Sequence, residues 1–236
     1  MDELENELDY VKYKDLLLPK KRSNQGLKND EDYLNSGNEQ INYLNENNLL
    51  DKNSNILDFG CGQGRILNCF KHVNVNFQSY TGVDTDGAAI NWCSKYLTYS
   101  DNIKFIHIPA FNQRYNKEGV GLIELPFEKN TFDLIFLNSV FSHMLSSDIM
   151  FYLKEFHKIL NNDGKIYLTA FIEENVPNEE ENPTNYLGKN LGPLHRVRFE
   201  KNYFSHLIQS SSFKIEKYDN QFIKRTGQSV ILLSKL

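Results

Sequence analysis

Apolar positions along this chain alternate between short runs of strand length and longer stretches with helical spacing. The predicted strands cover residues 55–59, 80–84, 104–108, 132–137 and 165–171. Helices are predicted before and between them, over residues 40–50, 64–70, 87–99 and 148–160. Strands that alternate with helices form a parallel sheet with right-handed crossovers, so the pattern predicts a doubly wound, Rossmann-like α/β fold.

The C-terminal region departs from this alternation. Residues 213–218 and 228–234 are predicted strands that are joined by a short turn-like segment without a helix. Parallel neighbours need a longer crossover, usually a helix. One strand of this pair is therefore expected to run antiparallel to the other.

Two polar segments lie outside the alternating pattern. Residues 1–38 are rich in Asp, Glu, Lys and Asn, and we interpret them as an N-terminal arm or lid on a single domain over residues 39–236. Residues 172–198 form a long polar insertion after the fifth strand, with an acidic run at residues 179–181. Long loops in compact domains are usually functional or mobile, so we expect this insertion on the substrate side of a site.

Composition restricts the classes of partner. The chain has 236 residues and a formal net charge of -5, and its densest basic cluster is only Lys20, Lys21 and Arg22. Duplex nucleic acid is therefore not an expected partner. No run approaches the ~18 apolar residues of a membrane span, and the acidic N-terminus does not have the pattern of a signal peptide. A cytoplasmic protein that makes no membrane contact is expected, and its oligomeric state is left open.

The cysteines give no sign of a metal site. Cys61, Cys69 and Cys93 form no CxxC pair and have no nearby histidines at zinc spacing. We therefore expect neither a structural metal nor a disulfide framework, which fits a reducing compartment.

The most informative segment is a strand that runs into a glycine-rich loop and then a helix. Gly60, Gly62 and Gly64 occupy alternate positions after Asp58. Glycines let the backbone turn sharply and let a ligand approach, and the N–H groups of the following helix favour an anionic group. A dinucleotide fingerprint GxGxxG needs a third glycine where this chain has Arg65, which weighs against a nicotinamide cofactor.

A second acidic residue follows at a distance typical of nucleoside sites. Asp84 ends a predicted strand 24 positions after Gly60, and such a carboxylate can accept hydrogen bonds from both ribose hydroxyls. The alternative is that Asp84 caps the helix that begins near Gly87, although Asp86 is the better cap candidate. The acid indicates a nucleoside and does not distinguish one nucleoside cofactor from another.

These segments resemble the class I S-adenosylmethionine (SAM) dependent methyltransferases, in particular the type 11 or 12 group. Beyond the acid and GxGxG loop, residues 124–127 with 132–138 are similar to the family's LPF…FDLI segment, and residues 160–166 to the turn before its fifth strand. The resemblance covers about residues 40–236. It implies a seven-stranded sheet whose last strand is antiparallel, and SAM as the cofactor.

The resemblance also implies roles for particular residues. The methionine-side loop would comprise Asp58, Gly60, Cys61, Gly62 and Gly64, and Asp84 would bind the ribose. Thr85 would flank the adenine. Many members have an aspartate after the third strand that contacts the adenine amino group, whereas this chain has Ala110 and Phe111 near that place. A backbone N–H of Ala110 or of Phe111 is expected to replace it, and Phe111 would offer its ring edge or face. Asn138 and Ser139 end the fourth strand, where cofactor and acceptor would meet.

Methyl transfer from a sulfonium needs mainly alignment and exclusion of water, so a general base is optional. An oxygen acceptor of high pKa would still benefit from one, and the candidate is His143, just past the fourth strand. The alternative is a helix-cap or packing histidine. Within the insertion, His195, Arg196 and Arg198 would bind an acidic or sugar acceptor, unless they are solvated charges that balance the acidic run.

The expected function is methyl transfer to a small molecule or glycan, with O-methylation favoured. The fourth strand ends in Asn138-Ser139-Val140-Phe141 and not in the Pro-Pro-Tyr type that DNA-base amino methyltransferases use. Two alternatives remain open: a non-catalytic SAM-binding protein, and a nicotinamide-dependent Rossmann oxidoreductase. Absence of a Tyr-xxx-Lys pair after the fourth strand weighs against the second.

Overall fold

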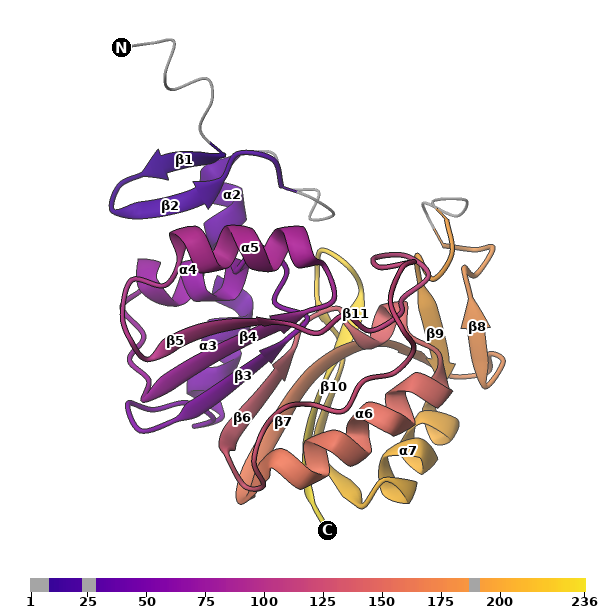
Figure 1. Cartoon of the computed structure of the whole chain (residues 1–236). Coiled ribbons are helices and arrows are strands. Elements are labelled where there is room, and N and C mark those ends of the chain that lie inside the picture. Colours follow the sequence, from indigo (N-terminus) through magenta and orange to yellow (C-terminus); the bar gives the residue numbers. More distant parts are fainter. Residues whose placement is uncertain (1–8, 23–28, 187–191) are drawn as a thin grey trace.

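In the computed structural model, which describes residues 9–22, 29–186 and 192–236, one central sheet is covered by helices on both faces (Figure 1). The sheet has nine strands, and its main path runs β10-β11-β7-β6-β3-β4-β5. Those strands are β3 (Asn55–Phe59), β4 (Ser79–Asp84), β5 (Ile103–His107), β6 (Phe132–Leu137), β7 (Leu160–Glu173), β10 (Phe213–Ile223) and β11 (Gln228–Lys235). The helices are α2 (Asp30–Asn35), α3 (Asn38–Glu46), α4 (Arg65–His72), α5 (Gly87–Tyr96), α6 (Ser146–Ile159) and α7 (Lys201–Ser210), with a 3₁₀ turn η1 (Phe141–His143).

Strand directions confirm the predicted fold class. β3 pairs in parallel with β4 and β6, β4 with β5, and β6 with β7. β11 lies between β7 and β10 and is antiparallel to both. The sheet is therefore mostly parallel with an antiparallel C-terminal strand, as the turn between the last two predicted strands required.

Alternation along the strands produces two hydrophobic layers. In β6, Ile135 and Leu137 join the layer that contains residues of α6 and α7, whereas Leu134 and Phe136 join the layer with residues of α3, α4 and α5. Successive side chains of a strand point to opposite faces, so a run that is apolar at every position belongs to a sheet covered on both sides. This double cover holds the strand ends, and the loops that follow them, in fixed positions.

Part of the predicted arm is folded against the domain. β1 (Tyr10–Tyr13) and β2 (Leu16–Pro19) form an antiparallel hairpin in which Leu16 and Leu18 are wholly buried. The indole of Trp92 on α5 donates to the Asp9 carbonyl at 3.0 Å. The hairpin is thus part of the α4/α5 layer, and the lid function predicted for residues 1–38 stays a prediction.

The insertion and the following segment contain elements that the sequence pattern did not predict. β9 (Val197–Glu200) pairs in parallel with the carboxyl end of β7, and β8 (Glu179–Glu181) pairs antiparallel with β9. α7 then leads into β10. The added strands extend the sheet beside β7, above the carboxyl ends of the central strands.

No helix in the described part of the chain is long and apolar enough to cross a bilayer.

Candidate functional site

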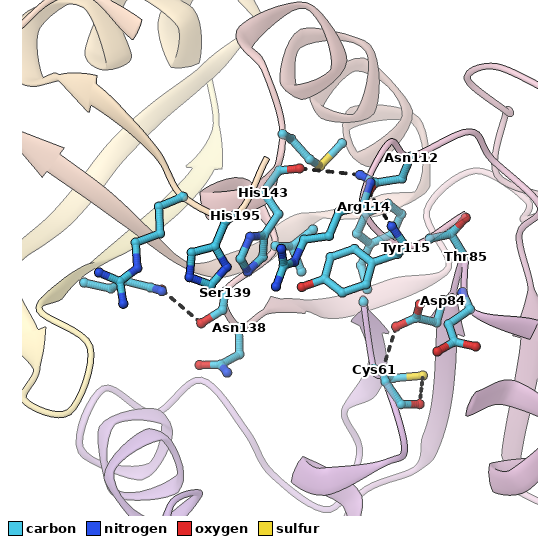
Figure 2. A pocket seen from close by; sticks show the side chains of 18 of the residues that line it. Cys61, Asp84, Thr85, Asn112, Arg114, Tyr115, Asn138, Ser139, His143 and His195 are labelled. Atoms are coloured by element: carbon cyan, nitrogen blue, oxygen red, sulfur yellow. Dashed lines mark hydrogen bonds between the residues drawn. The ribbon is translucent and has the colours of Figure 1, made fainter. Parts of the chain in front are cut away.

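A cavity of about 710 Å³ opens at the carboxyl ends of the central strands. Its size lies within the range of small-molecule sites, and its place is where open α/β sheets bind ligands. Figure 2 shows side chains from β4, from the segment after β6 and from the insertion converging on it. The predicted cofactor, catalytic and substrate residues line this cavity, with the exception of Gly64 and Arg198; they are Asp58, Gly60, Cys61, Gly62, Asp84, Thr85, Ala110, Phe111, Asn138, His143, His195 and Arg196.

The glycine loop has the backbone conformation that only glycine adopts easily. Gly60, Gly62 and Gly64 have φ values of +81°, +53° and +69°. The N–H of Gly60 donates to the Val83 carbonyl at 2.8 Å, which ties the loop to the end of β4. A Cβ added at Gly60 would lie 2.5 Å from Cγ2 of Val140. The loop therefore packs tightly against the segment after β6.

Substitution of Gly60 by alanine is expected to lower the free energy of unfolding by more than 2 kcal/mol. The left-handed conformation alone costs an L-residue about 1–2 kcal/mol, and the overlap with Val140 adds to it. Thermal unfolding monitored by circular dichroism measures the loss. The double variant Gly60→Ala/Val140→Ala should recover the part due to the overlap. If it recovers nothing, the close approach is not the cause.

Asp84 ends β4 with its carboxylate at the cavity. It accepts the N–H of Gly62 at 2.7 Å and the N–H of Asp86 at 2.9 Å. Asp86, and not Asp84, caps α5, because its carboxylate accepts the N–H groups of Ala88 and Ala89. A carboxylate has about four acceptor positions. Asp84 thus retains acceptor capacity toward a ligand while it fixes the glycine loop.

Asp58 lies beneath the loop and is only 3% exposed. The hydroxyl of Tyr80 donates to it. Burial raises its pKa to about 7, although that hydrogen bond and the charge of Arg65 act in the opposite direction. A carboxyl group in this state is stabilised as an anion when a cation enters the cavity beside it.

The segment after β5 departs from the expectation for the adenine contact. The N–H of Ala110 donates to the Ile108 carbonyl at 2.7 Å, and the N–H of Phe111 donates to the Gly121 carbonyl at 2.8 Å. Thr85 donates its hydroxyl to the Ala110 carbonyl at 2.5 Å. Both N–H groups are used within the protein, so their predicted role as replacement donors is wrong. This segment offers the cavity the ring of Phe111, which is 46% exposed.

His143 points into the cavity from η1 (Figure 2). Its Nδ1 lies 2.9 Å from the Leu194 carbonyl oxygen. A carbonyl only accepts, so Nδ1 carries the hydrogen and Nε2 has a free lone pair. Enclosure by the protein is the main cause that lowers its pKa to about 4, and the charge of Arg114 contributes. The imidazole is therefore neutral at physiological pH, with Nε2 able to accept a proton.

The end of β6 is strained. Ser139 has a φ of +60°, a left-handed conformation that is unusual for serine. Its N–H donates to the Thr169 hydroxyl at 2.7 Å, and its own hydroxyl donates to the Gln228 side chain at 3.1 Å. Strain of this kind costs on the order of 1–3 kcal/mol and concentrates at functional sites. Asn138, directly before Ser139, lines the cavity (Figure 2).

The acidic run in the insertion is structural. Glu179 accepts the N–H of Ser146 at the start of α6, Glu180 pairs with Arg198, and Glu181 accepts the N–H of Leu194. Arg198 is thus paired with carboxylates and does not line the cavity. His195 and Arg196 remain at the cavity wall.

Two residues of the N-terminal arm lie away from the cavity. Tyr33 is wholly buried beneath Arg22, whose guanidinium lies 4.8 Å from the Tyr33 ring centroid, and neither residue lines the cavity.

Cavity residues that the sequence analysis missed include Arg65, Arg114, Tyr115, Gln221 and Arg225. Arg65 had a local signal, since it directly follows the glycine loop. Arg225 had none, because only folding brings the β10–β11 turn over the cavity.

Comparisons with known proteins agree with this fold. Residues 57–168 match a family described as a methyltransferase domain. The uncharacterized protein MJ0638 of Methanocaldococcus jannaschii is 27% identical over 125 residues, which are 53% of this chain and 44% of that protein. This chain thus matches less than half the length of that relative.

Three solved structures share the fold at low sequence identity. A SAM-dependent methyltransferase from Aquifex aeolicus superposes with a TM-score of 0.58, 16% identity and coverage of 88% of this chain and 94% of that one. The 1,6-didemethyltoxoflavin-N1-methyltransferase of Burkholderia thailandensis, with bound S-adenosylhomocysteine, superposes with a TM-score of 0.57 and 16% identity. The match covers 87% of this chain and 79% of that one. The [4+2]-cyclase SpnF superposes with a TM-score of 0.61 and 13% identity, and the match covers 84% of this chain and 81% of that one. The fold therefore carries more than one chemistry.

Proposed function

We propose that this chain is a class I SAM-dependent methyltransferase, as the family match over residues 57–168 and the fold support, and that it transfers a methyl group from SAM to an oxygen of a small-molecule or glycan acceptor. The observation that carries the proposal is that Asp58, Asp84 and His143 line one cavity together with the glycine loop. In this proposal the two carboxylates form the cofactor end of the cavity, and the histidine would lie beside the acceptor.

The residues present fit the cofactor. Asp84 would hold the ribose hydroxyls, because it is a carboxylate with acceptor capacity left at the cavity. Asp58 would face the cationic methionine end, since its buried carboxyl gains most from a nearby positive charge. Phe111 would offer an apolar surface to the adenine.

His143 is the proposed general base. SAM, when bound, supplies an electrophilic methyl carbon attached to a good leaving group. Nε2 of His143 would take the hydroxyl proton of the acceptor as the oxygen attacks, while Nδ1 keeps its hydrogen bond to Leu194. This fixed tautomer spares the ring any reorientation during the reaction.

Cofactor binding is expected to release protons near neutral pH. Asp58 has its pKa raised to about 7 in the free protein, so it is partly protonated at pH 6.5. The cationic methionine end would lower that pKa, and a proton would leave on binding. SAM affinity should therefore fall as the pH decreases below about 7. Titration calorimetry at pH 6.5 in buffers of different ionisation enthalpy measures the proton count, and Asp58→Asn should release none from this site. Equal release by both proteins would contradict the assignment.

Turnover is tested by incubating the protein with methyl-labelled SAM and a panel of phenols, sugars and amines. Transfer of label to an oxygen supports the proposal. If SAM binds and no acceptor is labelled, a non-catalytic or non-methylating role is supported instead, which the cyclase of the same fold makes a concrete alternative.

A further inference from the structure

The segment that carries His195 and Arg196 is held rigidly beside the cavity. The N–H of Leu194 donates to Glu181 at 2.7 Å, and the N–H of Arg196 donates to the Asn182 side chain at 3.1 Å. The Asn182 N–H returns a bond to the Arg196 carbonyl at 2.6 Å. These hydrogen bonds fix the backbone of the segment that carries His195 and Arg196 to the end of β8 and the residue after it.

The Arg196 guanidinium lies among aromatic rings. Its central carbon is 5.9 Å from the Phe171 ring centroid and 5.7 Å from that of Tyr186. Stacked guanidinium groups keep their N–H edges available for a planar acceptor. Phe171 and Tyr186 line the same cavity, so the platform is part of its wall.

The carboxylates nearby are already used by another arginine. Arg198 pairs with Glu173 at 3.0 Å and with Glu180 at 2.6 Å, and Tyr186 donates its hydroxyl to Glu173. Within residues 9–22, 29–186 and 192–236, Arg196 forms no ion pair. Among these residues, its guanidinium instead lies near the rings of Phe171 and Tyr186.

His195 adds hydrogen-bonding capacity at the same place. Both ring nitrogens are shielded from solvent and have no hydrogen-bond partner in the described part of the chain. Shielded polar groups are usually hydrogen-bonded, and such an exception calls for an explanation. A ligand group that accepts hydrogen bonds would satisfy a ring N–H of His195 and the Arg196 edge together.

We propose that the methyl acceptor carries an oxyanion group, a carboxylate or a phosphate, that binds to Arg196 and His195 while its acceptor oxygen lies beside His143. This inference rests on the proposed function. The His143 and His195 ring centroids are 6.5 Å apart, so one ring or sugar unit spans the two positions. A neutral acceptor would leave the partly buried Arg196 charge at the cavity without an anionic partner.

The test is titration calorimetry on protein saturated with S-adenosylhomocysteine. The probes are 4-hydroxybenzoate, phenyl phosphate and the neutral 4-hydroxybenzamide. At least one anionic probe should bind roughly tenfold or more tighter than the amide. Comparison of the two anions identifies the preferred group. Equal binding of all three would overturn the proposal.

Variants locate the effect. Arg196→Gln should abolish the preference for the anion, and Arg196→Lys should keep only part of it, because an ammonium lacks the planar fork. Lys214→Gln on β10 removes the same charge at an exposed position outside the cavity and should change nothing. An unchanged preference in Arg196→Gln would also overturn the proposal. SAM is titrated first into every sample: if wild-type protein binds neither SAM nor S-adenosylhomocysteine, the proposed function fails, whereas normal SAM binding without anion preference removes only the acceptor assignment.

Discussion

Replacement of Asp84 by alanine is expected to reduce SAM affinity by roughly 100-fold or more. The carboxylate would accept charge-assisted hydrogen bonds from two ribose hydroxyls, each worth about 1.5–3 kcal/mol. The same change removes the acceptor for the Gly62 N–H and so loosens the glycine loop. Titration calorimetry measures the affinity. Asp84→Asn keeps one acceptor oxygen and should bind SAM with intermediate affinity.

Asp86 provides the matched control. It is two residues away and also carries a carboxylate, but that group caps α5 through the N–H groups of Ala88 and Ala89. Asp86→Ala should cost about 1 kcal/mol of stability and change SAM affinity little. Equal losses of affinity in the two variants would mean that Asp84 acts through the fold and not through the ligand.

Replacement of His143 by asparagine is expected to lower kcat by about 100-fold to 10,000-fold, the usual contribution of a general base. The asparagine amide can still donate toward the Leu194 carbonyl, so the substitution removes the Nε2 lone pair with little change in the fold. SAM affinity should stay unchanged. His157→Gln is the control, since His157 lies on α6, packs against Phe213 of β10 and does not line the cavity. A normal kcat in His143→Asn would exclude the base.

The pH dependence provides a second readout for His143. Its pKa is lowered to about 4, so Nε2 is unprotonated in most molecules above about pH 5. At saturating SAM, kcat/KM for the acceptor should hold steady from pH 7 to pH 5 and fall toward pH 4. A histidine of ordinary pKa would lose activity near pH 6.5. A decline centred there would contradict the enclosed, neutral state of this ring.

The cofactor end of the site could be predicted from sequence because its determinants are local. The strand Asn55–Phe59, the glycines after it and Asp84 at the end of the next strand lie in one βαβ unit. The spacing of that unit fixes which residues meet at the carboxyl edge of the sheet. The Asp86 cap was predictable for the same reason.

The rest depends on tertiary contacts that no local pattern encodes. The N–H groups of Ala110 and Phe111 are taken by carbonyls, one of them at Gly121 across the loop. Leu16 and Leu18 form a buried hairpin inside a segment whose composition is polar. Arg225 reaches the cavity only because β10 and β11 fold back beside β7. The partners of Glu179–Glu181 meet them only through the pairing of β8 with β9 and the fold around it.

The measurement that tests the central claim most directly is calorimetric titration of the wild-type protein with SAM and, separately, with NADH. Asp84 at the ribose position would suit the nucleoside of either cofactor. Arg65 stands where the dinucleotide fingerprint GxGxxG has its last glycine, which favours SAM. We expect one SAM site per chain with micromolar affinity and no binding of NADH, as a SAM-dependent methyltransferase requires. Binding of NADH, or no binding of SAM, would contradict it.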